Sequence, residues 1–511
     1  MERTLLSMWA KKDTIKNSIA NITSKFWSIV AIYFFIPFYI NILGEEAYGL
    51  VSFFATLQAA MNILGLGLAN TLRREFAIGD SKNDNVNIRK YKLLKSTELI
   101  YFMLAILVVA ICFLGSHTIA DQWFSQSSLG QNIIAVTLVL MGGSIALQFL
   151  TNMYHGCILG LGNQITANAM YIGWSAIKNI GALVVICIIA PDIRVFYVWH
   201  IISDLIYLVI LRIYVVHKLN SNKRLEWKLQ DFKIMKSILP YTAGILIISI
   251  IALINKQMDK IIISKYMSLE ELGAYNSAFL LGQLITIVSS AVSVALFSYY
   301  TQMFSKGDIS LLRSKFLYDN KLITIIIACL GVYIAVFAPE LLMFWTKSNI
   351  YVSIIEHGVF FIVMGSLFLA LQEIPYAFVL AQGNTKINIQ LGLFSLPFTI
   401  VGMVMAVKSY GVTGASIFYF LLMVSSTLIY ICIIYKKYFG KWNLKVLFID
   451  IVMPITICLG IAIVSRIAIK SLLVGLVPTI IAAIFCGAVN LIVMLLSIKS
   501  IRRVIKTKLF P

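Results

Sequence analysis

The sequence predicts an all-α polytopic membrane protein with about fourteen transmembrane helices, arranged as two parallel six-helix bundles followed by two further helices. Three observations lead to this fold class. The 511-residue chain is 60% apolar and only 13% charged. Its apolar residues gather in fourteen long stretches, and short motifs of the first half recur in the second half at a nearly constant offset.

The composition excludes a soluble enzyme. About a quarter of the residues in an ordinary soluble domain are charged, and a mean hydropathy of +0.90 leaves too few polar residues to cover a surface in water. The net charge of +20 does not indicate nucleic acid, because the basic residues lie in short runs between apolar stretches. The seven cysteines lie in or beside these stretches without CxxC spacing, which favours packing over metal binding.

Each apolar stretch is long enough for a transmembrane helix, which needs roughly 20 residues. None shows the alternating pattern of a membrane β-barrel. The eighth, ninth and tenth exceed this length, so we expect them to tilt or to project beyond the bilayer. The stretches lie near residues 17–41, 47–70, 93–115, 131–153, 168–190, 194–217, 237–264, 271–303, 317–345, 351–381, 387–406, 411–435, 446–465 and 472–497.

The distribution of Lys and Arg orients these helices. With the N-terminus in the cytoplasm, the cytoplasmic segments hold 31 basic residues, the outer connections hold 6, and 5 lie within the stretches. Cytoplasmic loops of membrane proteins carry such an excess. We therefore expect both termini in the cytoplasm, which requires an even number of helices.

A duplication relates the two halves of the chain. The offsets of three matching motifs are 225, 228 and 221 residues, the first counted between the Glu-Glu pairs at 45–46 and 270–271. Each offset corresponds to six helices and therefore preserves orientation. The matches are LGEEAYG at 43–49 with LEELGAY at 269–275, Gly79-Asp80 with Gly307-Asp308, and LGNQ at 161–164 with QGNT at 382–385.

The repeat sets the expected domains. We expect six-helix bundles over residues 1–230 and 231–440, and two further helices with a basic cytoplasmic tail over residues 441–511. Two related bundles around a central site that opens to each side in turn are typical of transporters. A duplicated scaffold without transport is the alternative.

The motifs also resemble a known family. The block NKQMDKIIIS at residues 255–264, followed by LEELGAYN at 269–276, resembles the polysaccharide-flippase (Wzx-type) branch of the multidrug/oligosaccharidyl-lipid/polysaccharide (MOP) exporter superfamily. LGEEAYGL at 43–50 and GLGLAN at 65–70 are similar to the second-helix pattern of that family. The resemblance extends over most of residues 15–440.

This resemblance implies a function. Such proteins carry undecaprenyl-pyrophosphate-linked oligosaccharides from the cytoplasmic to the periplasmic leaflet of the bacterial inner membrane, for polymers such as the O-antigen of lipopolysaccharide. A lipid-linked oligosaccharide and membrane lipids are then expected partners, with a polysaccharide polymerase and a chain-length regulator as candidate partners, and we expect a functional monomer. Two alternatives stay open: a cation-coupled multidrug extrusion antiporter, and a lipid II flippase, a class that also has fourteen spans.

Ionisable residues deep in a transmembrane helix are candidates for function, because charge is costly there. Lys178 lies midway along the fifth stretch, about 15 Å from either surface at 1.5 Å per residue. Asp204 lies at nearly the same depth in the antiparallel sixth stretch, so we expect the two to pair or to share water. Lys178 is a candidate anion site, Asp204 a candidate proton or cation site, and Trp174 is placed to stack on a sugar ring. A purely structural ion pair is the alternative.

Three further basic residues lie nearer the cytoplasmic ends of their helices. Lys25, in the first stretch, is a candidate for meeting the pyrophosphate as it enters from the inner leaflet. Arg73 and Arg74, at the end of the second stretch, are candidates for the same task. The alternative for all three is an interfacial role, because long basic side chains reach back to the headgroups.

The second half offers three more candidates. Lys256 and Asp259 are three residues apart on one helical face, so we expect a local pair in which Lys256 binds substrate and Asp259 the coupling ion. Lys260 is expected to extend outward to the interface. Glu373 is a candidate for the coupling ion at a helix break caused by Pro375.

The sequence disfavours an enzyme. Its five histidines are scattered, and no nucleophile–base pair, metal-ligand spacing or Walker-type phosphate loop is legible. We expect no metal and no organic cofactor, and a proton or sodium gradient as the energy source. Three lysines within the helices against two aspartates favour an anionic substrate over the cations that drug antiporters export.

Overall fold

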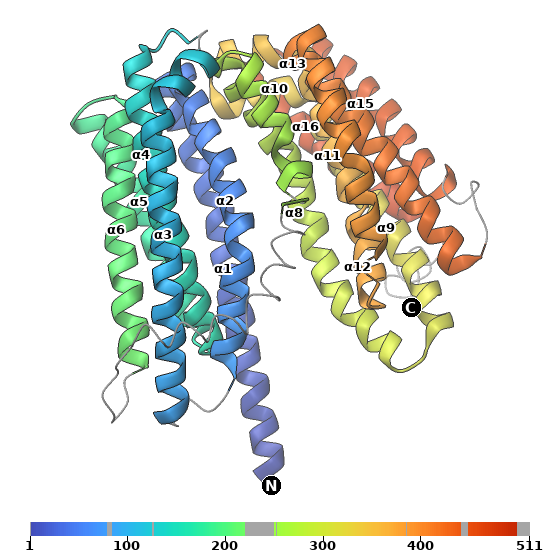
Figure 1. Ribbon diagram of the computed structural model, residues 1–511. Helices are drawn as coiled ribbons and strands as arrows, with labels where there is room; N and C mark the ends of the chain where they lie inside the picture. Colours follow the sequence, from blue (N-terminus) through green and yellow to red (C-terminus); the bar gives the residue numbers. More distant parts are fainter. Residues whose placement is uncertain are drawn as a thin grey trace. The chain divides into compact units, whose positions relative to one another are not determined.

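A computed structural model (Figure 1) describes residues 2–78, 84–124, 127–219, 250–251, 253–384, 386–440 and 448–497, with side chains except at 2–15, 18, 62–68, 70, 84 and 497. Over this part of the chain the backbone is helical apart from turns and contains no strand, which confirms the all-α fold class. Half of the predicted seventh helix, 237–264, and the predicted bundle boundary at residue 230 lie outside the described residues.

The chain divides into two compact units, Met1–Gln257 and Met258–Pro511. In the N-terminal unit six long helices run up and down, each antiparallel to the one before it (Figure 1). They are α1 (Glu2–Leu43), α2 (Glu45–Ala77), α3 (Asp84–Trp123), α4 (Gln131–Gly160), α5 (Gln164–Ile188) and α6 (Ile193–Lys218).

Helix α4 lies at the centre of the N-terminal unit and contacts α2, α3, α5 and α6. Two glycines four residues apart let it approach α2 closely. A Cβ on Gly156 would lie 2.8 Å from the carbonyl oxygen of Ala69, and one on Gly160 would lie 2.5 Å from that of Arg73. Helices in membranes are held by such close van der Waals packing, because lipid removes the hydrophobic driving force between them.

The C-terminal unit is built around α11, which contacts α8, α9, α10 and α13. Its helix α13 is broken at Tyr410 and Gly411, where the backbone angles are not helical, so it contains the two predicted stretches 387–406 and 411–435. The helices are residues 253–266, α8 (Leu269–Ser305), α9 (Ile309–Val336), α10 (Ala338–Thr346), α11 (Asn349–Leu371), α12 (Glu373–Ala381), α13 (Lys386–Phe439), the π-helix η2 (Phe448–Val452), α15 (Met453–Leu472) and α16 (Leu476–Ser497).

Prolines accompany two breaks in this unit. Helix α12 begins at Glu373, two residues before Pro375, so the predicted break at this proline is present. The stretch expected at 317–345 is also divided, because α9 gives way to α10 at Phe337, two residues before Pro339. Proline cannot donate the backbone hydrogen bond that a continuous helix needs.

Helix α15 packs along α9. Asp450, just before α15, pairs with Lys321 of α9 at 3.0 Å. About two turns further along both helices, the Sγ atoms of Cys458 and Cys329 lie 3.4 Å apart. These contacts tie the appended helix pair to the rest of the C-terminal unit.

The last two turns of α15 extend beyond the predicted stretch. That stretch was expected near residues 446–465, whereas α15 continues to Leu472 and includes Arg466 and Lys470. Their side chains lie 2.8 and 3.0 Å from the Glu340 carboxylate of α10. This pairing offsets the cost of two charges that a hydropathy pattern would place outside the helix.

The turns after α4 and α12 support the duplication. Gly162 and Gly383 have positive φ angles of 80° and 72°. The next residue, Asn163 or Asn384, donates its backbone N–H to the carbonyl five residues earlier, at 3.2 and 3.3 Å. This closure around a left-handed glycine is a Schellman motif. The repeated Gly-Asn pairs therefore form the same helix cap in both units.

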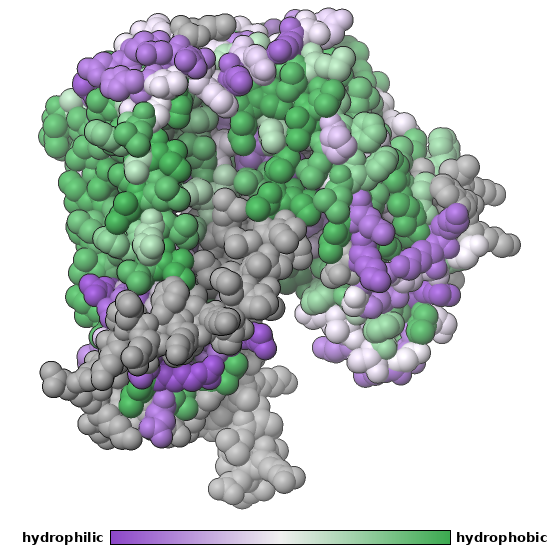
Figure 2. Space-filling model, in the orientation of Figure 1, coloured by the Kyte–Doolittle hydropathy of each residue, from purple (hydrophilic) through white to green (hydrophobic). Residues whose placement is uncertain are grey.

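Eleven helices of the described residues are long and apolar enough to span a membrane, counting the broken α13 once. Figure 2 shows hydrophobic side chains along the middle of the N-terminal helices and hydrophilic ones towards their ends. This is the arrangement that a hydrocarbon layer requires. The count of fourteen spans and the cytoplasmic termini stay predictions.

Candidate functional site

The deepest charges of the N-terminal unit form an ion pair. The ammonium of Lys178 on α5 donates to both carboxylate oxygens of Asp204 on α6, at 2.7 and 2.9 Å. Only 8% of the Lys178 side chain and none of the Asp204 side chain is exposed. The proximity predicted from their equal depth is thus present, and the two charges neutralise each other away from lipid.

The Asp204 carboxylate is surrounded by donors. Besides Lys178, it accepts hydrogen bonds from the Ser144 hydroxyl at 2.6 Å and from the Gln148 amide at 3.0 Å, both on α4. The same amide donates to Ser144, so the Ser144 proton is directed at Asp204. Gln58 of α2 donates in turn to Gln148. Each of these neighbours acts as a donor, and both oxygens of the Asp204 carboxylate act as acceptors.

Aromatic rings enclose the ammonium. It lies 5.0 Å from the centre of the Trp174 ring, which stacks on Tyr207 of α6 with 4.6 Å between centroids. Trp199 donates its indole N–H to the backbone carbonyl of Lys178 at 3.1 Å. Its ring fits because residue 181 is glycine, where a Cβ would lie 2.2 Å from it. Aromatic faces attract a cation and exclude water, so in this conformation Trp174 holds Lys178.

Sequence reasoning missed three of these side chains. Ser144 lies four residues before Gln148, so helical spacing could have placed these two side chains on one face of α4. Tyr207 lies three residues after Asp204, so the same spacing could have placed it on the Asp204 face of α6. Trp199 carried no such signal, because its contact is to a main-chain oxygen and depends on how α5 and α6 pack.

Polar side chains line the contact of α1 with α5, below this pair. Ser24 donates to Asn168 at 2.6 Å, and Asn168 donates to Asn21 at 2.7 Å. One turn further along, the hydroxyls of Ser28 and Tyr171 lie 3.1 Å apart. Hydrogen bonds of this kind hold membrane helices together, and their groups can also bind the hydroxyls of a sugar when the helices separate.

The three basic candidates near the helix ends have exposed side chains. They are Lys25 on α1 and Arg73 and Arg74 in the last turn of α2. Arg73 also contributes backbone to the tight contact with Gly160. Exposure suits either a first contact for an anion or an interfacial anchor, so their role in substrate capture stays a prediction.

The C-terminal unit holds a second buried charge cluster, which differs from the prediction. Asp259 is buried and accepts the Tyr275 hydroxyl at 3.0 Å. Lys256 is exposed, so the expected Lys256–Asp259 pair is not formed. Lys260 does not extend outward but is buried, with its ammonium 3.7 Å from the centre of the Phe279 ring. The reason is that Tyr275 and Phe279, both on α8, cover the face of residues 259 and 260.

Glu373 lies at the start of α12, where the helix break exposes backbone groups. Its carbonyl accepts the Ser293 hydroxyl of α8 at 2.9 Å, and the preceding Gln372 donates to Thr427 of α13 at 2.7 Å. The break is therefore held by side chains from two neighbouring helices. Binding of a coupling ion by the Glu373 carboxylate stays a prediction.

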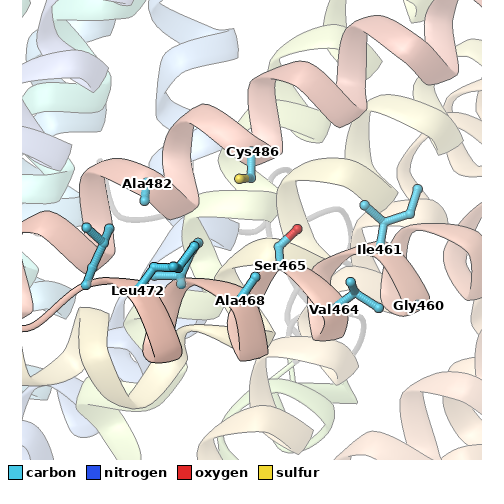
Figure 3. A pocket seen from close by; sticks show the side chains of 10 residues that line it. Gly460, Ile461, Val464, Ser465, Ala468, Leu472, Ala482 and Cys486 are labelled. Carbon is cyan, nitrogen blue, oxygen red and sulfur yellow. The ribbon is translucent and has the colours of Figure 1, made fainter.

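An apolar groove of about 630 Å³ lies between α15 and α16. Figure 3 shows Ile461 and Leu472 of α15 and Ala482 of α16 along it. Ser465 and Cys486 are the polar members of its lining. The volume is within the range of ligand pockets, about 300–1,000 Å³, and the chemistry suits a hydrocarbon chain.

The helical fold is shared with solved structures of membrane transporters. The lipid II flippase MurJ in an inward closed conformation matches over 97% of this chain and all of its own, with a TM-score of 0.69 and 14% identity. An inward-facing MATE multidrug transporter of the MOP superfamily matches over 82% and 95%, with a TM-score of 0.66 and 13% identity. A mutant of the Vibrio cholerae MATE transporter VcmN matches over 85% and 99%, with a TM-score of 0.55 and 14% identity.

The sequence defines the family more narrowly. The family profile of polysaccharide biosynthesis proteins matches residues 14–304, which is more than half of the chain. The chain therefore belongs to the polysaccharide biosynthesis protein family, and it shares its fold with solved structures of the MOP superfamily, as the resemblance predicted. No curated protein sequence matches it. The solved structures of the same fold are transporters and flippases rather than enzymes.

Proposed function

We propose that this protein is a flippase that moves an oligosaccharide linked to undecaprenyl pyrophosphate from the cytoplasmic to the periplasmic leaflet of the bacterial inner membrane. Its product would supply a surface polysaccharide such as the O-antigen of lipopolysaccharide. Membership of the polysaccharide biosynthesis family supports the substrate class. The fold shared with a lipid II flippase supports the transfer of a lipid-linked sugar.

The observation that carries the proposal is the buried ammonium of Lys178. A pyrophosphate that crosses a bilayer needs a cation at mid-depth, because an unpaired charge in hydrocarbon costs several kcal/mol. Lys178 can leave Asp204 for such an anion without leaving the carboxylate bare, since Ser144 and Gln148 continue to donate to it. The ammonium of Lys178 is thus paired with Asp204 in this conformation and can be transferred to an anionic substrate.

The rest of the substrate has matching surfaces. The sugar hydroxyls would replace the hydrogen bonds of the α1–α5 contact around Asn168 and Tyr171. Within the C-terminal unit, the α15–α16 groove has an almost entirely apolar lining, which suits an isoprenoid chain. We further propose that a proton or sodium gradient drives the cycle, with Asp204 as the first candidate for binding the ion.

A deletion strain tests the function. It is expected to accumulate lipid-linked oligosaccharide in the cytoplasmic leaflet and to lose the surface polysaccharide, and drug susceptibility is measured in parallel. Accumulation of lipid II instead would favour the lipid II flippase. A change in drug tolerance with normal polysaccharide would favour the antiporter and contradict the proposal.

Complementation of that strain tests the ammonium. Lys178→Ala is expected to abolish polysaccharide export, because Ala removes the cation and leaves Asp204 as the uncompensated charge at this depth. Protein in the membrane fraction is expected at the wild-type level, because Ser144 and Gln148 still donate to Asp204 when Lys178 is absent. Lys306→Ala, at an exposed helix end, is the control and should restore export. Normal polymer with Lys178→Ala would remove Lys178 from the site.

A further inference from the structure

A buried histidine lies beside the ion pair without a hydrogen-bond partner. His200 of α6 is 8% exposed, and neither ring nitrogen makes a hydrogen bond within the described residues. A neutral imidazole carries one donor and one acceptor, so burying both unpaired costs free energy. His200 lies four residues before Asp204 and therefore on the same face of α6. The unpaired group sits one turn from the carboxylate.

The immediate surroundings of His200 are aromatic. Its ring centroid lies 4.2 Å from that of Phe196, 5.5 Å from that of Tyr197 and 6.4 Å from that of Phe54 on α2. The Tyr197 hydroxyl is also buried without a hydrogen-bond partner within the described residues. These rings flank the imidazole, and the charge that acts on it is that of Lys178 in the ion pair.

The titratable groups around His200 come from four helices. They are Lys178 on α5, Asp204 and Tyr197 on α6, Tyr48 on α2 and Tyr39 on α1. The α4 side chains at the pair, Ser144 and Gln148, do not titrate near neutral pH. Imidazole is the group of this set whose ordinary pKa, about 6.5, is nearest to neutral pH. The charge of Lys178 opposes its protonation in this conformation, so His200 can gain a proton once that ammonium turns away.

His200 can compensate the charge of Asp204 when Lys178 moves away. In this conformation Lys178 and Asp204 neutralise each other. When Lys178 turns to an anionic ligand, Asp204 keeps two neutral donors but loses its cation. A carboxylate in a site of low dielectric then favours a proton or a new cation nearby. The imidazole one turn away can supply that cation by binding a proton.

We propose that His200 takes up a proton and replaces Lys178 as the cationic partner of Asp204 whenever Lys178 binds the anionic group of a ligand. The neutral imidazole gains one proton from water, becomes an imidazolium and donates an N–H to the carboxylate; when Lys178 returns, the proton leaves. One proton is thus linked to each anionic ligand bound. This rests on the proposed function and deepens it, because it names a residue through which a proton gradient can act on substrate affinity.

The position of His200 fits a route to one side of the membrane. His200 lies in the half of α6 that begins at Ile193, and Tyr197 lies one turn closer to that end. The distribution of basic residues predicts that this end faces the periplasm. A proton entering there would meet Tyr197 first, then His200, and then Asp204.

Calorimetry tests the linkage on the purified full-length protein in lipid nanodiscs. Farnesyl diphosphate serves as the anionic isoprenoid probe, and its binding is measured at pH 7.5 in two buffers of different ionisation enthalpy. Wild type is expected to take up about one proton more per diphosphate bound than His200→Gln, which cancels protonation of the probe itself. Between pH 8 and 7 the affinity of wild type should rise about tenfold more than that of His200→Gln. His217→Gln, an exposed histidine of the same helix, is the control and should behave as wild type.

The outcomes are separable. Binding with equal proton uptake in wild type and His200→Gln overturns the His200 inference and leaves the proposed function standing. No binding by wild type, alongside a deletion strain that accumulates no lipid-linked oligosaccharide, overturns both. If His200→Gln does not fold, solid-state NMR of wild type labelled with ¹⁵N-histidine decides. One imidazole should become protonated when the probe binds, and no change in any of the five would overturn the inference.

Discussion

The two units hold a buried carboxylate in different ways. In the N-terminal unit, Asp204 accepts hydrogen bonds from three side chains, one of them the ammonium of Lys178. In the C-terminal unit, Asp259 accepts one hydrogen bond, from Tyr275, and its other oxygen has no partner within the described residues. The neighbouring Lys260 directs its ammonium at an aromatic ring instead.

Near one end of the helices, by contrast, each unit has a carboxylate that is paired with a lysine. Glu98 of α3 pairs with Lys95 at 2.6 Å and accepts the hydroxyl of a tyrosine on α4. Asp319 of α9, 221 residues later, pairs with Lys315 at 2.7 Å and accepts the hydroxyl of Tyr300. The two units thus agree at a helix end and differ in the middle. We infer that the duplication supplies the scaffold, whereas the mid-membrane charges serve different tasks.

The largest effect is expected from breaking the complete cluster. Asp204→Ala leaves the Lys178 ammonium buried without its counter-charge and should destabilise the protein by about 3–5 kcal/mol. Thermal unfolding in detergent measures the loss. The double variant Lys178→Met/Asp204→Leu should recover much of the stability, since apolar pairs replace buried ion pairs well, but should not restore export. Normal export by the double variant would reduce the pair to a structural role.

A smaller effect is expected at two matched tyrosines. Tyr275→Phe removes the hydroxyl that binds Asp259 and should destabilise the protein by about 1.5–3 kcal/mol, as expected for a hydrogen bond to a charged group. Tyr207→Phe removes a buried hydroxyl that has no hydrogen-bond partner within the described residues and should not lower stability, because a buried hydroxyl without a partner already costs free energy. Unfolding midpoints of both variants check this difference. Equal losses would show that the two clusters are satisfied to the same degree.

The smallest effect is expected at Glu340 of α10, which lies between the candidate membrane spans Ile309–Val336 and Asn349–Ala381. Burial raises the pKa of this carboxyl, but Lys470 and Arg466 outweigh it and hold the pKa below its ordinary value of 4.5. Because the folded pKa is the lower one, the stabilisation is present above about pH 4.5 and is lost as the pH falls through the folded pKa. Glu340→Gln should therefore lower stability at pH 7, by less than about 1 kcal/mol because both partners are partly exposed.

The pH dependence supplies the control for Glu340. Wild type and Glu340→Gln should have closer unfolding midpoints at pH 3 than at pH 7, because the wild-type carboxyl is then neutral as well. A difference that stays constant over this range would show that Glu340 contributes through packing and not through its charge.

Helical periodicity allowed part of the site to be predicted. Lys178 and Asp204 were placed at one depth because the rise per residue is fixed, and the structure joins them. The same reasoning failed for Lys256 and Asp259. Two side chains three positions apart on one helix still point about 60° away from each other. The packing of α8 buries Asp259 but not Lys256.

The sequence by itself determined the helical fold, the membrane location of its long apolar segments and the repeat, because each depends on local hydropathy and spacing along the chain. Only the tertiary structure decided which buried charges have partners. Ser144 completes the shell of Asp204 from a helix 60 residues away, and Lys260 turns to a ring of α8. A hydrogen bond depends on a few tenths of an ångström between helices, and no pattern along one helix fixes that distance.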